Sequence, residues 1–496
     1  MVYLFPPCCT SDPSKGPNTD QDASSSEAEE QNTDQDASFS EEEEEQSVKS
    51  EVIDQTSTTT TNSQRLEAAA INQSETQNTQ QYASFLGVSP SKIKTTAESQ
   101  VILQEIAAST GIKTAIIYVN FVPQKGVPRS RGLLKTVQDS DVLNIGVVTA
   151  NGVPVKKPIS GVTRKQVLDE FKKLSQEITD PGKAQSTSYL ASSQKIYQWL
   201  IASQEAELQK QGINNLMFVM DEGMRSLPVA ALHDGKQFLV EKYSLGILPS
   251  FSLTKTGSQS IRNSPVLAMG AEKFTVDQSQ TELGAVPIEV TSIVRQIKGG
   301  KYLLNEDFNF TNLKAQTTAT AYQIIHLATH ADFPNKQRGG IKESYIQLYD
   351  SKLRYDQIAE LGWNRNKLPV ELLVLSACKT AAGDEEAEMG FAGLAIKTGV
   401  NTVLASLWYA SDPGTLGLMT EFYRSLKTAK SKTEALRAAQ LAMIRGEVRI
   451  EDNQLIGSQS SIKITTEQSE YLQDNIVGNL SHPYNWAAFT MIGNPW

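Results

Sequence analysis

The chain has 496 residues, which at roughly 150 residues per domain allows about three domains. Residues 1–60 hold 15 acidic and 2 basic side chains, a net charge of −13, whereas the other 436 residues carry +3, which gives the formal net charge of −10. The remainder is nearly neutral, which argues against a strongly basic nucleic-acid-binding protein. The sequence contains no run of 18 apolar residues, which is about the length that a membrane-spanning helix needs.

Three cysteines are present, Cys8, Cys9 and Cys378. They exclude a disulfide framework and a cysteine-rich zinc site. The first ten residues do not resemble a signal peptide. We therefore expect a reducing, cytoplasmic location.

The first 95 residues are predicted to be a disordered, acidic, low-complexity tail. They are rich in Ser, Thr, Gln, Asp and Glu, and the heptad NTDQDAS occurs at both 18–24 and 32–38. Such a composition buries too little apolar surface to offset chain entropy. Within it, only a short helix near 64–71 is expected.

From residue 96 onward, strand-like and helix-like segments alternate. Short runs rich in Val, Ile and Leu predict strands at 115–122, 142–149, 216–220, 265–269, 323–328, 371–376, 401–407 and 487–492. Apolar residues at helical spacing predict helices at 163–178, 189–207, 288–297, 390–399, 413–426 and 432–445. The polar stretch 448–480 is predicted to be an insertion loop. This alternation predicts an α/β fold, with a mostly parallel sheet between two layers of helices.

Three of the predicted strands are followed by residues whose side chains could take part in catalysis or binding. QIIHLATHA leads to His330, ELLVLSACKTA leads to Cys378, and NTVLASLWYASD runs out to Asp412. Binding sites in open parallel sheets lie outside the carboxyl ends of the strands, so neighbouring strands would bring these residues together. An imidazole beside a thiol suits nucleophilic catalysis, in which His takes the thiol proton and the thiolate attacks a carbonyl.

Each of these residues also has a purely structural interpretation. Cys378 could be a small buried side chain, and Asp412 could cap the helix that begins at Pro413. The other histidines, His233, His326 and His482, are interpreted as structural. Sequence signatures of serine hydrolases, nucleotide-binding loops and metalloproteases are absent from the sequence.

Several segments together resemble the CHAT domain family, bacterial relatives of separase and the caspases that are common in cyanobacteria. They are MFVMDEGMRSLPVAALHDGKQFLVEKYSLGILPSFSLT, HLATHADF, VLSACKTAAGD, GFAGLAIKTGVNTVLASLWYASD, LMTEFYRSL and HPYNWAAFTMIGNP, and they fall in the family's order within residues 185–496.

The resemblance implies a caspase-like α/β/α sandwich (clan CD), with an inactive half at 96–300 and a catalytic half at 301–496. It places a catalytic dyad at His330 and Cys378, and an oxyanion hole at the backbone N–H groups of Ala331 and Cys378. The family usually has Gly where this chain has Ala331. Ala would be strained there if the position required a positive φ.

The resemblance also implies a substrate site along the third strand, with Ser406, Trp408 and Asp412 as the candidate substrate-binding residues. In separase-like relatives the residue that matches Asp412 lines the pocket for the side chain before the cleaved bond. A carboxylate there favours Arg or Lys.

The leading hypothesis is therefore a cysteine endopeptidase that acts on protein or peptide substrates, cleaves after a basic residue and needs no cofactor or metal. The family often carries tetratricopeptide repeats, and none is recognised in this sequence, which places such an activator on a separate chain. The alternatives are an inactive signalling scaffold, favoured by Ala331, and a cysteine-dependent acyl transferase.

Overall fold

A computed structural model of the chain describes residues 42–89, 91–124, 137–275, 280–363, 369–376, 379–380 and 385–496. Side chains are described from residue 62 onward, except at 359, 379, 380, 385 and 386. The chain divides into two compact units, Met1–Thr59 and Thr60–Trp496. Cys378, like Cys8 and Cys9, lies outside the described residues.

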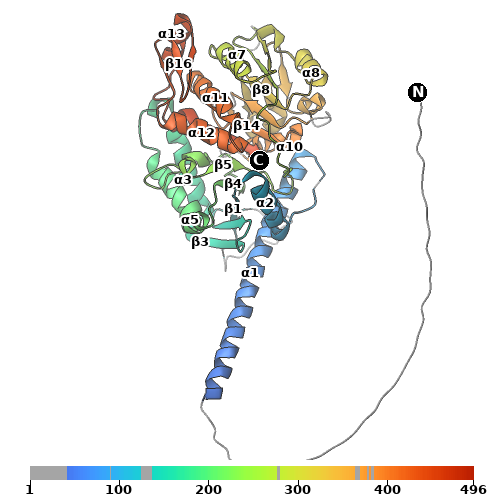
Figure 1. Cartoon of the computed structure of the whole chain (residues 1–496), viewed down its shortest axis with the longest axis vertical. Helices are drawn as coiled ribbons and strands as arrows, with labels where there is room; N and C mark the ends of the chain where they lie inside the picture. Colours follow the sequence, from blue (N-terminus) through green and yellow to red (C-terminus); the bar gives the residue numbers. More distant parts are fainter. Residues whose placement is uncertain are drawn as a thin grey trace, which may run out of the picture. The chain divides into compact units, whose positions relative to one another are not determined.

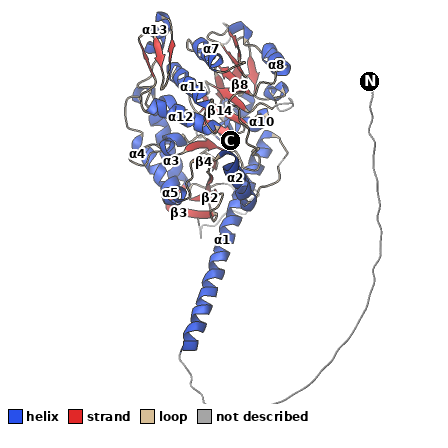
Figure 2. Ribbon diagram, viewed as in Figure 1, coloured by secondary structure: helices blue, strands red, loops and turns tan. Residues whose placement is uncertain are grey.

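An eleven-stranded sheet runs through the second unit in the order β3-β2-β1-β4-β5-β18-β14-β12-β8-β6-β7 (Figures 1 and 2). Its strands are β1 Thr114–Val122, β2 Val142–Thr149, β3 Val155–Thr163, β4 Asn215–Met220, β5 Ser244–Ile247, β6 Val266–Gly270, β7 Lys301–Leu304, β8 Ile324–Ala328, β12 Leu372–Leu375, β14 Thr402–Ser406 and β18 Phe489–Gly493. Every neighbouring pair is parallel except β3–β2, β2–β1 and β18–β14. The predicted, mostly parallel sheet is confirmed.

The sheet consists of two parallel blocks that point in opposite directions. Strand β18 is parallel to β5 but antiparallel to β14, so the direction reverses between β18 and β14. The carboxyl ends of β8, β12 and β14 therefore share one edge, and those of β1, β4 and β5 lie at the opposite edge. Only the first of these edges carries the residues singled out from the sequence.

Helices cover both faces of the sheet, as expected for three layers. They are α1 Glu42–Leu86, α2 Thr96–Thr110, α3 Arg164–Thr179, α4 Leu190–Tyr197, α5 Ser203–Lys210, α6 Leu239–Lys242, α7 Val286–Gln296, α8 Phe310–Ala319, α9 Glu385–Ala392, α10 Leu394–Thr398, α11 Asp412–Leu426, α12 Lys432–Ile444, α13 Thr466–Asp474 and α14 Pro483–Trp486. Alternate strand side chains point to opposite faces. Ile117 of β1 accordingly packs in the cluster that contains α3, α7, α11 and α12, and Ile116 packs with α1 and α2.

A second sheet lies beyond the carboxyl ends of β8 and β12, in the order β11-β10-β9-β13. Its strands are β9 Ala331–Phe333, β10 Tyr345–Gln347, β11 Lys352–Arg354 and β13 Lys379–Thr380. Strand β9 begins directly after His330, and β13 begins directly after Cys378 in the sequence. Lys379 pairs with Asp332 in parallel register, so the segments that follow the two proposed catalytic residues run side by side.

The predicted tail is too long, because residues 62–86 are not disordered. They form the second part of α1, and apolar residues such as Ile71 and Tyr82 are buried there. Sequence composition misses this packing because half of the buried positions of α1 are polar, and Ser74, Glu75 and Thr79 find partners far away in the chain. Glu75, for example, is buried and accepts a hydrogen bond from the Tyr118 hydroxyl at 3.0 Å.

Two further expectations need correction. Residues 448–480, called the inserted segment below, form β15 Arg449–Glu451, β16 Gln454–Ile456, β17 Ser461–Lys463 and α13 rather than a loop. The sheet does not divide at residue 300, because β6 pairs with β8 and thus belongs to the same parallel block as β8, β12 and β14. The change of block falls between β5 and β6.

Candidate active site

The carboxyl edge of β14, β12 and β8 gathers the candidate residues. These three strands are direct neighbours, as the sequence-based argument requires. Strand β8 ends two residues before His330, and β12 ends three residues before Cys378. After β14, the chain reaches Asp412 at the start of α11. The structure thus brings the chain segments that lead to all three residues to one edge.

The His330 imidazole is held by a backbone carbonyl and two aromatic rings. Its Nε2 lies 2.8 Å from the carbonyl oxygen of Thr281. The rings of Phe274 and Tyr409 lie against it, with centroids at 5.3 and 5.7 Å. Because a carbonyl oxygen only accepts, Nε2 carries the hydrogen, and Nδ1 is the basic nitrogen of the neutral ring.

Burial sets the proton affinity of this ring. Desolvation lowers the pKa of His330 below its ordinary value, and the hydrogen bond to Thr281 opposes part of the shift. The imidazole is therefore neutral at physiological pH, which is the form that a general base requires.

Ala331 has unstrained backbone geometry at the start of β9. Among the described residues, positive φ outside glycine occurs only at Asn305, Asp452 and Asn453. The backbone conformation at position 331 therefore does not require glycine. The His330 carbonyl accepts a hydrogen bond from Gln347 of β10 at 2.8 Å. Because successive residues of a strand point their backbone groups to opposite sides, the N–H of Ala331 points away from β10, toward the β13 side.

Asp412 is held on one carboxylate oxygen by two donors. Its Oδ2 accepts hydrogen bonds from the backbone N–H of Ala285 at 2.8 Å and from the Tyr471 hydroxyl at 3.0 Å. The N-cap of α11 is Ser411, whose Oγ accepts from the Gly414 N–H, so the helix-cap interpretation of Asp412 is wrong.

Burial raises the pKa of Asp412 to about 6. The two hydrogen bonds lower it, and the charges of Glu289 and Glu272 raise it further. Asp412 and His330 are tied to the same short segment, through Ala285 and Thr281 respectively. The carboxylate and the imidazole therefore share one support.

The other two candidate substrate-binding residues are placed differently. Ser406 is fully buried at the end of β14, opposite Phe489 of β18, so it presents no surface to a substrate. Trp408 is partly buried, and its Nε1 donates to the Tyr484 carbonyl at 3.0 Å. Of the two, only Trp408 retains exposed surface near the site.

The remaining histidines have structural partners, in agreement with the sequence-based interpretation. His326 is fully buried, with Nδ1 at 3.1 Å from the Tyr423 hydroxyl and Nε2 at 2.9 Å from Glu289. His233 Nδ1 accepts from the Gly235 N–H within a turn. His482 caps α14, where its Nδ1 accepts from the Tyr484 N–H.

Sequence reasoning missed Thr281, Phe274, Tyr409 and Tyr471. Thr281 acts through a backbone carbonyl, which has no side-chain signature. Tyr409 is the exception, because it follows Trp408 within the strand-end motif that was already singled out.

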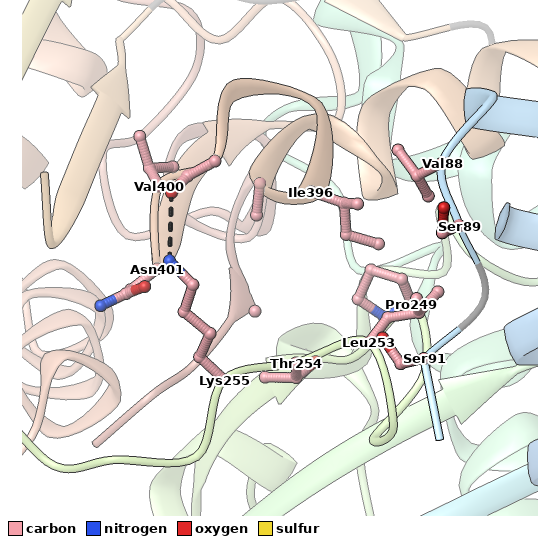
Figure 3. Close-up of a pocket in the computed structure, with 13 residues that line it drawn as sticks. Val88, Ser89, Ser91, Pro249, Leu253, Thr254, Lys255, Ile396, Val400 and Asn401 are labelled. Atoms are coloured by element: carbon pink, nitrogen blue, oxygen red, sulfur yellow. Dashed lines mark hydrogen bonds between the residues drawn. The ribbon is translucent and has the colours of Figure 1, made fainter. Parts of the chain in front are cut away.

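A cavity of about 270 Å³ lies away from this site (Figure 3). It is lined by Val88, Ser89, Ser91, Pro249, Leu253, Thr254, Lys255, Ala395, Ile396, Gly399, Val400, Asn401 and Gly493. The segment 399–401 enters β14 at its amino end, so the cavity lies at the edge opposite His330. In the part of the chain that the structure describes, no cluster of three His, Cys, Asp or Glu residues could hold a metal, and no helix is long and apolar enough to cross a membrane.

Residues 190–494 match the CHAT domain family, and the chain belongs to this family. That range agrees with the resemblance expected over 185–496. No curated protein matches the sequence.

Solved structures with a similar fold include two of the separase–securin complex of Saccharomyces cerevisiae. They show 10% and 11% identity and TM-scores of 0.43 and 0.40, and each match covers 81% of this chain and 31% of the other. The Arg-specific cysteine proteinase gingipain R is similar at 11% identity with a TM-score of 0.34, over 65% of this chain and 75% of the other. This chain thus spans less than a third of the separase chains that it matches.

Proposed function

We propose that this protein is a cysteine endopeptidase that cleaves protein substrates after a basic residue. The observation that carries the proposal is the orientation of His330: a carbonyl holds Nε2–H, and the basic Nδ1 remains for a proton transfer. Membership of the CHAT family and the pairing of Lys379 beside Asp332 support Cys378 as its partner.

In the proposed reaction, Nδ1 of His330 takes the proton of the Cys378 thiol. The thiolate attacks the scissile carbonyl, and the backbone N–H groups of Ala331 and Cys378 stabilise the resulting oxyanion. His330 then gives the proton to the leaving amine, and water hydrolyses the thioester with His330 again as base.

Asp412 is proposed to recognise the basic side chain before the cleaved bond. Within the described part of the chain its Oδ1 has no hydrogen-bond partner, whereas Oδ2 has two. Trp408 and Tyr409 precede it on the same loop, and Tyr409 contacts His330. The residues from 96 to the end of β5 are proposed to be the inactive caspase-like half, and an activator with tetratricopeptide repeats is proposed to lie on a separate chain.

The inactive-scaffold alternative loses its main support. It depended on strain at Ala331, and Ala331 does not have positive φ. No geometric feature of the described residues now favours it over turnover.

The test is an unbiased peptide-library cleavage profile of the full chain. We expect cleavage after Arg or Lys in wild type and none above background in Cys378→Ala or His330→Ala. A Cys8→Ala/Cys9→Ala protein is the matched control and should retain full activity. Cleavage that persists in Cys378→Ala would overturn the dyad, and transfer of the acyl group to an added amine in place of hydrolysis would favour the acyl transferase.

A further inference from the structure

We propose that Tyr471 is a positioning residue, which holds the Asp412 carboxylate for recognition of a basic substrate side chain. This inference rests on the proposed function and adds to it the inserted segment, 448–480, as the element that completes the specificity site. The sequence singled out neither Tyr471 nor a role for this segment.

A continuous chain of hydrogen bonds links the inserted segment to the site. The Gly284 N–H donates to the Tyr471 hydroxyl at 3.0 Å, and that hydroxyl donates to Asp412 Oδ2 at 3.0 Å. Burial and the Asp412 charge raise the pKa of Tyr471 to about 12, so the hydroxyl stays protonated and remains a donor at neutral pH.

This arrangement gives the two carboxylate oxygens different tasks. Oδ2 is saturated by Tyr471 and Ala285, while Oδ1 has no hydrogen-bond partner among the described residues. An ammonium group, or one N–H of a guanidinium, can therefore bind Oδ1 without displacing a protein contact.

The surroundings explain why two donors are needed. Glu272 and Glu289 disfavour the charged form of Asp412, as does burial, whereas the hydrogen bonds from Ala285 and Tyr471 favour it. Among the described residues, Tyr409 is a further titratable group that interacts electrostatically with Asp412. Without the Tyr471 hydroxyl, more of the carboxyl would be protonated near neutral pH and would bind a cation less well.

The inserted segment is anchored at a second point on the same helix. Glu421 of α11 is buried and accepts hydrogen bonds from Ser458, at 3.0 Å from the backbone N–H and 2.7 Å from Oγ. Glu421 lies nine residues after Asp412, about 13.5 Å along the helix axis. Two contacts so far apart hold the segment along α11, next to which α13 and β16 lie in Figure 1.

The experiment measures kcat and KM of the full chain between pH 5 and 8, for two peptides that differ only in Arg or Leu before the scissile bond. We expect Tyr471→Phe to raise KM for the Arg peptide about tenfold, the effect of one hydrogen bond to a charged group, with little change in kcat. The acid limb of kcat/KM should move to higher pH, and the Leu peptide should be unaffected. In an Asp412→Asn background, Tyr471→Phe should have no further effect on the Arg peptide.

Two further variants separate positioning from general damage. Gly284→Ala would place a Cβ 2.6 Å from the Tyr471 ring, which must then move, so it should reproduce the higher KM for Arg. Tyr302→Phe removes a hydroxyl from an exposed tyrosine on β7 and should leave both peptides unchanged. Equal losses for the Arg and Leu peptides, or an unchanged KM for Arg in Tyr471→Phe, would overturn the inference.

A binding measurement distinguishes this inference from the proposed function. In a Cys378→Ala background, the Kd of a fluorescent Arg peptide is measured with and without Tyr471→Phe. If wild type cleaves no peptide, the proposed endopeptidase activity fails, and the positioning role still stands if Tyr471→Phe weakens binding about tenfold. If wild type cleaves after Arg and the Kd does not change, the activity stands and the role of Tyr471 fails.

Discussion

The His330 imidazole owes its tautomer to a single backbone carbonyl. Thr281 lies 49 residues before His330 in sequence, and its oxygen accepts from Nε2. A side-chain substitution at Thr281 keeps this oxygen in place. The orientation of the base thus depends on where the segment around Thr281 is held, and the contact of Ala285 with Asp412 is one of its supports.

The titration of the Asp412 carboxyl should make cleavage pH-dependent in a way that affects only basic substrates. Its pKa is raised to about 6, so the carboxylate is charged above pH 6 and becomes neutral below it. At pH 5, one unit below this pKa, only about a tenth of the Asp412 carboxyl is ionised. The ratio of kcat/KM for the Arg peptide to kcat/KM for the Leu peptide should therefore fall about tenfold between pH 7 and pH 5. Titration of His330 affects both peptides and cancels in the ratio. A ratio that stays constant in wild type, or that still falls in Asp412→Asn, would contradict the assignment.

Replacement of His326 should mainly lower the stability of the protein, whereas replacement of His330 should mainly abolish its activity. His326→Ala leaves Glu289 and the Tyr423 hydroxyl buried without their partner, which should lower the free energy of unfolding by about 3–5 kcal/mol. His330 is only half-buried, so His330→Ala should cost about 1 kcal/mol or less while it abolishes cleavage. Urea denaturation of both variants measures this, and equal destabilisation would refute the distinction.

Helix α1 stabilises the fold although its sequence is mostly polar. Its buried Glu75 accepts hydrogen bonds from Ser250 Oγ and the Ser252 N–H, both at 2.7 Å, and Tyr82 packs under the Arg225 guanidinium at 4.9 Å from the ring centroid. These partners belong to the loops that follow β4 and β5. Residues 62–86 of the helix therefore contribute to the body of the protein and are not part of a disordered tail.

Truncations should reveal where the ordered body begins. Removal of residues 1–59 should shift the thermal midpoint by only a few degrees, because residues 60–496 form a compact unit that includes the whole sheet. Removal of residues 1–90 should lower it by more than about ten degrees, since each large buried side chain such as Ile71 or Tyr82 contributes about 1.5–3 kcal/mol. A small shift in the longer truncation would mean that α1 is dispensable. Calorimetry of the two proteins makes the comparison.

The two oppositely directed blocks of the sheet meet at a strand from the C-terminal end of the sequence. Strand β18 lies between β5 and β14, and Ile492 pairs with both Ile247 and Val403. The sheet is continuous only when β18 is in place. The late part of the chain is thus needed to join the two blocks.

A charge at this junction should prevent folding. Ile492 is fully buried, so Ile492→Asp would bury an unpaired carboxylate between the blocks. We expect the protein to be insoluble or to unfold without a cooperative transition. Leu303→Asp on the edge strand β7, where the side chain is only partly buried, is the matched control and should still fold. Cooperative unfolding of Ile492→Asp near the wild-type midpoint would argue against the central role of β18.

Local sequence patterns were sufficient to predict most strands and the edge of the sheet on which the candidate site lies. Runs such as ELLVL and TVLAS are apolar because both faces of a central strand are buried, and this leaves a signal within a few residues. The rule that sites lie at carboxyl ends then placed His330 and Asp412 together.

Tertiary structure alone decided the features that depend on distant partners. The support of His330 by Thr281, the contact of Tyr471 with Asp412, the burial of polar α1 and the insertion of β18 all join segments far apart in sequence. Backbone carbonyls and buried polar side chains are stabilised by specific hydrogen bonds and not by apolar periodicity. Their partners cannot be identified until the chain is folded, which is why the sequence predicts the edge of the site but not its supports.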